Sequence, residues 1–330
     1  GHSKAGSQKA TDVLSGGIAG SRLGFRGTED LGNGMKALFT LEYGISPDVS
    51  GGGLTFTRQS FVGLSGNFGT VSLGRQYAPG YYATATHGAV SAGPLDPISV
   101  LTSGLSIAPG SAARWDNSIN YKSPSFGGFT VQAIYSASGS VVDGATENRT
   151  SDDDLGLGLS YNNGPLAVNY VYQATETAFT AATQSVGIVG GVPAVVTTAA
   201  TDAVEADEHF IGASYNFGVM KLTGSYQIAK FDYNTASDRD VKVATIGGII
   251  PVGAGNVHVS IGKRWDDNSN ADAKSYGLAY THGLSKRTTV YAGVNRTSND
   301  DNAGFGSVIA GAGGNGENET AFAVGINHTF

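Results

Sequence analysis

Apolar and polar residues alternate along most of this chain. In the segment MKALFTLEYG (35–44), Met, Ala, Phe, Leu and Tyr occupy the odd positions, whereas Lys, Thr and Glu occupy three of the even positions. The segments 129–136 and 166–173 repeat the pattern. Successive side chains of a β-strand point to opposite faces, so the alternation predicts strands with one apolar face and one polar face.

About fifteen such segments follow one another, and the connections between them alternate in length. The segments start near residues 21, 35, 55, 69, 117, 129, 154, 166, 208, 220, 240, 255, 273, 288 and 318. The short connections are rich in turn-forming residues: EDLGNG, SGNF, SPSFGG, NNGP, NFGV, PVGAG and GLSKR. The long, mostly polar connections are 78–116, 137–153, 177–207, 267–272 and 299–317. Short turns on one rim and long loops on the other predict a transmembrane antiparallel β-barrel.

The physical basis of this prediction is backbone hydrogen bonding. An unpaired backbone group in hydrocarbon costs several kcal/mol, so a sheet spans a bilayer only when it closes and has no edges. Closure turns the apolar face toward lipid and leaves the polar face to water. We therefore expect residues 1–330 to form a single all-β barrel domain with aromatic residues near the membrane interfaces.

The N-terminal segment raises a question of strand number. Single-chain bacterial barrels have an even number of strands. Counting back from Phe330 places the first strong strand at Ser21, on the long-loop rim. We expect residues 1–20 to be the remnant of a first external loop, with an initial strand missing and sixteen strands in the intact barrel. The alternative is that part of 9–20 supplies a poor strand. No secretory signal is present, which suggests a mature or trimmed chain.

Composition narrows the function classes. The chain has 50 Gly, no Cys and a net charge of −7, which argues against nucleic acid as a partner. No apolar run approaches the roughly 18 residues of a membrane-spanning helix. The six His residues are scattered without metal-ligand spacing, and no nucleophile-elbow motif is present. We expect no enzyme activity, no metal site and no cofactor, although a catalytic triad assembled in space would escape this test.

Four segments carry a resemblance to a known family. They are SRLGFRGTEDLGNGMKALFTLEYG (21–44), RQSFVGLSGNFGTVSLGRQYAP (58–79), NSINYKSPSFGGF (117–129) and the terminal GINHTF. They closely resemble the general diffusion porins of Gram-negative bacteria, in their β-proteobacterial branch. The resemblance implies an outer-membrane homotrimer of sixteen-stranded barrels, each with a long third loop folded into the pore, through which small hydrophilic solutes and ions diffuse passively.

The resemblance also implies a role for the last residue and shows two departures. In such proteins the closing aromatic residue, here Phe330, is part of the signal that the outer-membrane assembly machinery reads. Family members usually open with a short strand similar to VTLYG, which is absent here. Asn327 stands where many relatives carry a basic residue before the final His, which alters the charge at that rim.

The pore constriction is expected where the third loop meets the wall. If residues 78–116 form that loop, its only acids are Asp96 and Asp116. On the wall, Arg22 and Arg26 occupy even positions of their segment, whereas the apolar Leu23 and Phe25 occupy odd positions. Both arginines should therefore point to the face opposite the lipid, into the lumen. A lipid-facing Arg near the bilayer midplane would cost about 2–4 kcal/mol.

By motif, the family's constriction arginines correspond to Arg22, Arg58 and Arg114. Three guanidinium groups with few opposing acids predict weak to moderate anion preference. The alternative is that each Arg pairs with a carboxylate and only stiffens the loop; the candidate partners are Glu29, Glu42, Asp96 and Asp116. Arg75 is a less certain member of this arginine cluster, because it occupies an odd position, as do the outward-facing Val71 and Leu73 of its segment.

Two further alternatives concern the surface and the lumen. Acid clusters at the long-loop rim, such as Asp152–Asp154, could hold divalent cations that bridge lipopolysaccharide, or they could be solvated loop tips.

A plugged, non-conducting barrel that serves as an adhesin or surface scaffold would share the lipid-facing pattern and differ only inside. The many Gly, Ser, Thr, Asn and Gln at lumen-facing positions favour a water-filled pore.

Overall fold

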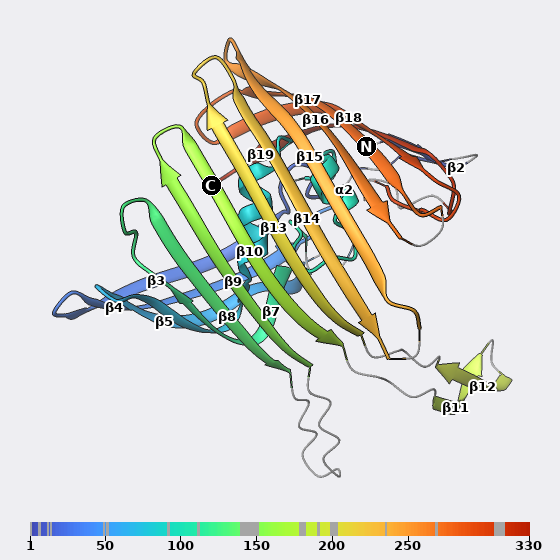
Figure 1. Ribbon diagram of the computed structural model, residues 1–330, viewed down its shortest axis with the longest axis horizontal. Helices are drawn as coiled ribbons and strands as arrows, with labels where there is room; N and C mark the ends of the chain where they lie inside the picture. The colour runs from blue at the N-terminus through green and yellow to red at the C-terminus, as the bar shows by residue number, and fades with distance from the viewer. Residues whose placement is uncertain are drawn as a thin grey trace.

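A computed structural model gives the arrangement of the chain. It describes all residues except 1, 6–7, 12, 14, 49, 51–52, 91–92, 111–112, 139–151, 178–182, 190–191, 199–203, 235, 268–269 and 307–313. The described residues form an all-β, antiparallel protein with two short helices (Figure 1).

Fifteen long strands dominate the described part of the chain. They are β3 (Arg22–Gly32), β4 (Met35–Ile45), β5 (Leu54–Gly66), β6 (Gly69–Tyr77), β7 (Arg114–Lys122), β8 (Phe129–Ser138), β9 (Asp152–Asn163), β10 (Leu166–Thr177), β13 (Val204–Asn216), β14 (Lys221–Tyr233), β15 (Arg239–Val252), β16 (Gly255–Asp266), β17 (Ala273–Gly283), β18 (Thr288–Asn299) and β19 (Glu319–His328). Each corresponds to one segment predicted from the alternation, with starts displaced by at most four residues. The largest displacement is at β13, which begins at Val204, four residues before the predicted start at 208.

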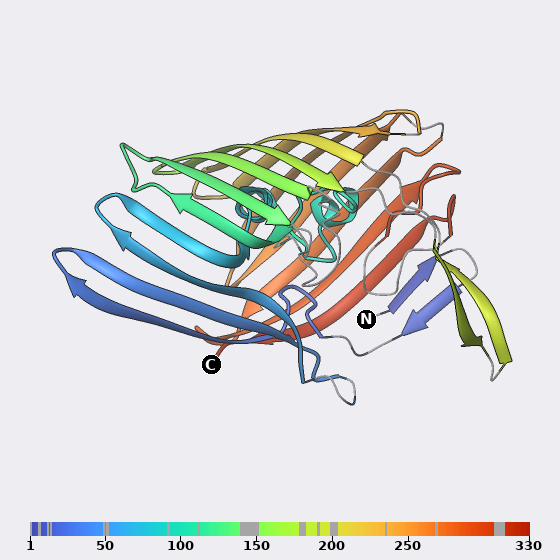
Figure 2. The same cartoon turned by 90° about the horizontal axis from the view of Figure 1, so that it is seen from below.

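The long strands form an antiparallel meander. Each strand pairs with the next along the chain from β3 to β10 and again from β13 to β19, and β10 pairs with β13. Between β10 and β13 the chain forms a separate hairpin of β11 (Thr183–Val189) and β12 (Val192–Thr198), seen apart from the main sheet in Figure 1. The main sheet curls around an interior space (Figure 2).

Within the described residues the sheet is not closed. Strand β3 pairs with β4 alone. Strand β19 pairs with β18 along its length, but on its other side only Glu319–Phe322 pair, with β1 (His2–Ala5). Strand β1 in turn pairs with β2 (Gln8–Thr11). Residues 2–5 and 8–11 therefore form a short hairpin at the long-loop end of β19, where the sequence predicted loop.

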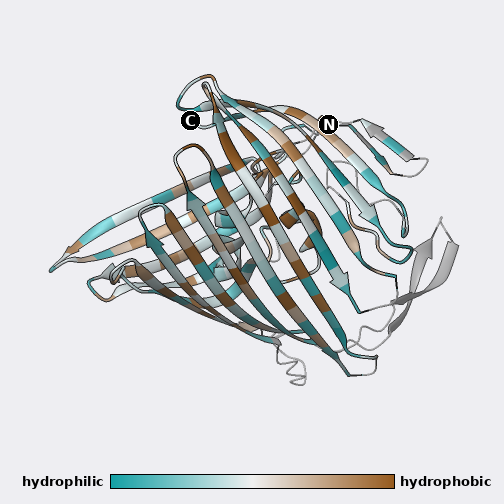
Figure 3. Cartoon of the chain, turned by 45° about the horizontal axis from the view of Figure 1, so that its top comes forward, coloured by the Kyte–Doolittle hydropathy of each residue, from teal (hydrophilic) through white to brown (hydrophobic). Residues whose placement is uncertain are grey.

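The two faces of the sheet differ as the alternation predicts. In β17, Tyr276, Leu278 and Tyr280 are exposed on the outer face, whereas Ser275 and Ala279 are buried on the inner one. Figure 3 shows the resulting alternation of hydrophobic and hydrophilic residues along the strands. No helix among the described residues is long and apolar enough to span a membrane.

The segment between β6 and β7 folds into the interior. Its base is closed by a hydrogen bond from Ala78 N to Ala113 O (2.9 Å). It contains α1 (Pro79–His87) and α2 (Pro97–Leu101), which lie inside the curved sheet in Figures 1 and 2. Apolar side chains of the loop pack on the inner wall: Leu101 and Leu105 on β14, β15 and β17, and Ile98 and Ile107 on β10 and β13. The predicted inward loop is confirmed, and it spans 78–113.

Candidate functional site

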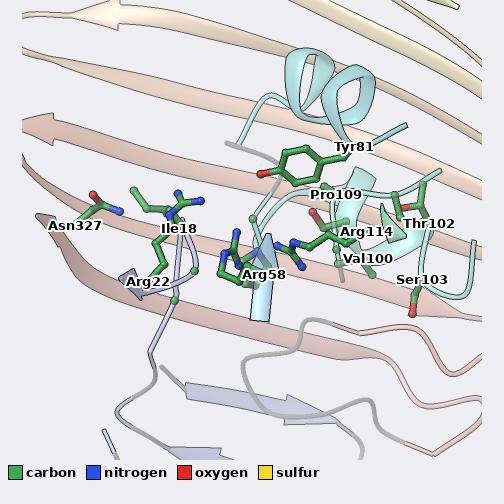
Figure 4. A pocket seen from close by; sticks show the side chains of 18 of the residues that line it. Ile18, Arg22, Arg58, Tyr81, Val100, Thr102, Ser103, Pro109, Arg114 and Asn327 are labelled. Atoms are coloured by element: carbon green, nitrogen blue, oxygen red, sulfur yellow. The ribbon is translucent and has the colours of Figure 1, made fainter. Parts of the chain in front are cut away.

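A cavity of about 830 Å³ lies between the inward loop and the inner wall. Strands β3, β5 and β7 contribute one arginine each to the wall, and segment 16–20 and strands β16–β19 complete it with His258, Thr281, Thr289 and Asn327. Arg22, Arg58 and Arg114 line it together with Tyr81 of α1. Figure 4 shows the three arginines along one side of the cavity, with the Tyr81 ring above Arg58 and Arg114. The structure thus brings together three arginines that are far apart in the sequence, because the alternate strands β3, β5 and β7 each present one of them from the inner face.

Arg58 is held by two hydrogen bonds. Its Nε donates to Glu42 Oε1 at 2.6 Å, and its Nη2 donates to the Tyr77 hydroxyl at 2.8 Å. The side chains of Arg58 and Glu42 are only 9% and 16% exposed, so this pair is shielded from solvent more than a surface ion pair. The pairing fixes the guanidinium and offsets part of its charge.

Arg114 differs because no carboxylate among the described residues forms an ion pair with it. Its Nη2 donates to the Tyr77 hydroxyl at 2.7 Å, and its guanidinium carbon lies 4.6 Å from the centre of the Tyr77 ring. Its Nε is buried without a hydrogen-bond partner in the described part of the chain. A neutral hydroxyl and a ring face orient the cation but leave its charge uncompensated.

Arg22 is the most exposed of the three. Its side chain is 42% exposed, and its Nη1 lies 3.9 Å from Glu42 Oε2. An exposed pair at that separation contributes little, because solvent screens it. The predicted alternative, in which each arginine pairs with a carboxylate, therefore applies to Arg58, weakly to Arg22 and not to Arg114.

The loop side of the cavity is uncharged at its surface. Residues 78–113 contain one carboxylate, Asp96, and no Lys or Arg. Asp96 is fully buried and accepts hydrogen bonds from Val90 N (2.6 Å) and Ile98 N (3.3 Å), so it caps α2 and does not reach the cavity. The prediction that Asp96 faces the pore is wrong, because the short acid serves the backbone of its own loop.

Tyrosines at the start of the loop connect it to the arginine side. The Tyr81 ring stacks on Tyr77 with centroids 3.6 Å apart, and Tyr82 packs edge-on against both. Burial, followed by the neighbouring Tyr77, raises the pKa of Tyr81 to about 12. Tyr81 is therefore neutral at physiological pH and adds no negative charge to the cavity.

Polar side chains of the wall fix the far side of the loop. Glu208 is buried and accepts hydrogen bonds from Ser106 N (2.6 Å) and Ile107 N (3.0 Å). Gln227 Nε2 donates to Ile107 O (3.1 Å). At the loop tip, Arg264 Nη1 donates to Leu101 O (2.9 Å). These contacts hold the loop at a defined distance from the arginines.

His87 ends α1 and packs between the loop and the wall. Its Nε2 donates to Asn169 Oδ1 at 2.8 Å, and its ring lies against Phe210. Burial lowers the pKa of His87 to about 4, and the hydrogen bond that His87 donates to Asn169 opposes that shift only in part. The imidazole is neutral in this interface at physiological pH.

Two further predicted charges, Asp116 and Arg26, do not line the cavity. Asp116 lies in β7 instead of the loop, and its side chain forms an ion pair with Arg75 at 2.7 Å. The left-handed backbone of Asn117 (φ 47°) and a register shift at Gly74 form a bulge that displaces Asp116 from the inner face. Arg26 lies four residues below Arg22 on β3, away from the cavity.

The alternation predicts strands and faces but not every functional contact. Tyr77, Glu208 and His87 were missed as organising residues, since nothing in a single sequence pairs residues that lie between 19 and 102 positions apart. Phe330 is fully exposed, with its ring edge-on to His328 at 4.8 Å. The described residues contain no group of three His, Cys, Asp or Glu side chains that could hold a metal ion.

Comparison with known proteins agrees with this architecture. The model of the family described as Gram-negative porin matches residues 1–302. The outer membrane porin protein 32 of Delftia acidovorans is 35% identical over 95% of this chain and 86% of its own length. An outer membrane porin protein of Bordetella pertussis is 33% identical over 83% of this chain and 75% of its own length.

A solved structure adds the three-dimensional match. The anion-selective porin from Comamonas acidovorans is 33% identical and superposes with a TM-score of 0.80, covering 96% of this chain and 91% of that protein. An inward loop, a polar lumen with an open cavity and an apolar outer face are the features of a water-filled channel in the outer membrane. The chain belongs to the Gram-negative porins, which form passive diffusion channels in the outer membrane.

Proposed function

We propose that this porin conducts anions in preference to cations, and that Arg22, Arg58 and Arg114 set the preference at the constriction. The observation that carries the proposal is the asymmetry of the cavity: three guanidinium groups on one side, one carboxylate among them, and an uncharged loop opposite. Positive potential in a narrow, partly desolvated passage raises the local concentration of anions and lowers their barrier.

The uncompensated charge of Arg114 is the largest contributor in this account. Glu42 can offset one of the other two arginines, which leaves the cavity with a net positive charge. The similarity to the anion-selective porin from Comamonas acidovorans supports the same sign of selectivity. The proposal involves diffusion without catalysis, and Asp96 and Asp116 have no part in the filter.

Salt substitution in a planar bilayer tests the proposal on the unmodified protein. Replacing chloride with the bulkier acetate at constant potassium should lower the single-channel conductance strongly, whereas replacing potassium with lithium should change it little. A larger effect of the cation exchange would contradict anion preference, although the protein would still be a conducting channel. Absence of conductance would favour the non-conducting barrel instead.

We also propose that the barrel assembles as a homotrimer through the outer face of β3–β6. An apolar surface groove of about 710 Å³ runs over these strands, lined by Phe39, Val62, Leu64 and Leu73, with Glu29 at its edge. A second copy would bury this groove. Light scattering of Val62→Lys in detergent should then give a smaller particle than the unmodified chain, while Val259→Lys on β16 should not.

Phe330 has a separate proposed role. Its ring is exposed and touches the barrel wall only edge-on at His328, which suits recognition by the outer-membrane assembly machinery. Phe330→Ala should reduce the amount of folded protein in the membrane and leave the conductance of folded channels unchanged.

A further inference from the structure

Four basic side chains lie side by side on the outer surface of β15–β18. They are Lys242, Lys263, Lys274 and Arg296, hereafter the basic band. Lys242, Lys274 and Arg296 are exposed, and Lys263 is half-buried over the Trp265 ring. The strand neighbours of Lys242 and Lys274, such as Val241, Val243 and Ser275, are buried inside, so the basic residues point out of the barrel.

The strand register makes the band contiguous. Lys263 stands directly opposite Lys274, and Lys242 and Arg296 occupy the diagonal positions on the flanking strands. Directly opposed side chains have Cβ atoms about 5 Å apart, and like charges at that spacing destabilise a sheet. Asp272 lies 3.3 Å from Lys263, but the described residues form no ion pair with Lys242, Lys274 or Arg296. The band is left with a net positive charge that a ligand could neutralise.

The position of the basic band relative to the membrane indicates which ligand it could bind. The four residues lie close to the long-loop ends of their strands. Directly below them the outer face is apolar, with Ile246, Ile261 and Leu278 about half exposed. In an outer-membrane barrel the long loops face the exterior, so the band lies at the level where the outer-leaflet headgroups begin. A cationic cluster at that level is complementary to lipid phosphate.

We propose that the basic band is a binding site for the phosphorylated headgroup of an outer-leaflet glycolipid, with its acyl chains along the apolar surface of β15–β18. The lysines and Arg296 would contact phosphate oxygens, and the opposed pair Lys263–Lys274 would share one phosphate. This site uses basic residues directly, in contrast to the cation-bridged acids that the sequence suggested. It lies outside the pore and does not depend on the selectivity of the channel.

Binding of bisphosphorylated lipid A to the purified full chain in dodecyl maltoside micelles tests the proposal, with bound lipid counted by native mass spectrometry. Each Lys near an anionic surface strengthens association roughly fivefold, so Lys263→Gln/Lys274→Gln should bind about 20-fold more weakly. The matched control Lys286→Gln/Arg287→Gln removes two charges from the short turn at the opposite rim and should bind like the unmodified protein. Equal affinity of all three proteins, or equal loss in both variants, would overturn the proposal.

Two further measurements separate binding from folding and from other anions. Without lipid, Lys263→Gln/Lys274→Gln should unfold at about the same temperature as the unmodified protein, because loss of the contacts of Lys263 with Asp272 and Trp265 offsets removal of the repulsive pair. Lipid A should then raise the unfolding temperature of the unmodified protein more than that of the variant, and an equal rise would contradict the site. Displacement of lipid A by inorganic phosphate at equal concentration would identify a free-phosphate site and overturn the lipid assignment.

Discussion

Arg114 donates a hydrogen bond of 2.7 Å to the Tyr77 hydroxyl, and its guanidinium also lies over the Tyr77 ring. The same hydroxyl accepts a bond of 2.8 Å from Arg58. One neutral side chain therefore holds two cations beside each other, against their mutual repulsion, at the edge of the cavity. The arrangement concentrates positive charge without a carboxylate for Arg114.

Removing this shared acceptor should loosen both arginines. Tyr77→Phe keeps the ring and leaves two buried donors unsatisfied, at a cost of about 1–3 kcal/mol for each. We expect a lower unfolding temperature in detergent and greater variation of the open-channel current. Tyr121→Phe, which removes an exposed hydroxyl bonded to Phe68 O, is the matched control and should have little effect. Equal destabilisation by the two variants would argue against the special role of Tyr77.

Glu42 should moderate the selectivity. Its carboxylate is the one that pairs with Arg58 and Arg22. Glu42→Gln would release both positive charges to the cavity, and a charge change at a few ångströms acts on a passing ion with roughly 1 kcal/mol in water-like surroundings. Since 1 kcal/mol corresponds to about a fivefold effect, we expect the chloride-to-potassium permeability ratio to rise at least about fivefold, as measured from the zero-current potential. A fall in that ratio would contradict the assignment of Glu42.

The buried carboxylate of Glu208 should control how firmly the loop is docked. In Glu208→Ala the amides of Ser106 and Ile107 lose their acceptor, which costs about 1–3 kcal/mol for each buried donor. A lower unfolding temperature and frequent conductance substates are the expected results. Glu205→Ala changes an exposed acid on the same strand and should resemble the unmodified channel. Quiet, unaltered currents in Glu208→Ala would show that other contacts suffice to hold the loop.

Acidification should weaken loop docking through His87. Burial lowers the pKa of His87 to about 4 in the folded protein, below the ordinary value of 6.5. The unfolded chain therefore binds the proton first as the pH falls, so the His87 contribution to stability is complete above about pH 6.5 and is lost between about 6.5 and 4. The difference corresponds to roughly 3 kcal/mol.

The surroundings of His87 sharpen the pH test. Asn169 faces its Nε2, and Lys221 lies near enough to disfavour a second positive charge. His87→Gln removes the titrating group and keeps a polar side chain. The slope of unfolding temperature against pH from 4 to 6.5 should be shallower in His87→Gln than in the unmodified protein. Identical slopes would assign the acid sensitivity to other groups.

The sequence predicted most of the scaffold because membrane strands obey a strict period of two. Strands β4, β6, β8, β10, β16, β17 and β18 begin at the predicted residues. The short strand β1 and the hairpin β11–β12 were missed, because short strands inside long connections have too few residues to establish an alternation. Strand β2 overlaps at residues 9–11 with the poor strand that the sequence left open within 9–20. The register that places Lys263 opposite Lys274 could not be predicted from the sequence either, because register depends on how two strands pair.

The functional residues were predicted as well as parity allows. Arg22, Arg58 and Arg114 meet at one cavity because they project from the inner face of the alternate strands β3, β5 and β7. Asp116 was misplaced because β7 begins three residues earlier than the apolar alternation indicated, and a bulge in β7 turns the Asp116 side chain off the inner face. Asp96 was misplaced because a loop acid can serve its own backbone, and that depends on a local fold the sequence does not display.

The most direct test of the central claim is the zero-current potential of the channel in a planar bilayer under a KCl gradient, for the unmodified protein and for Arg22→Gln/Arg58→Gln/Arg114→Gln. Arg75→Gln, which changes an arginine outside the cavity, is the control. We predict an anion-selective potential in the unmodified protein and in the control, and loss of that preference in the triple variant. A cation-selective unmodified channel, or a triple variant that keeps full anion preference, would contradict the account.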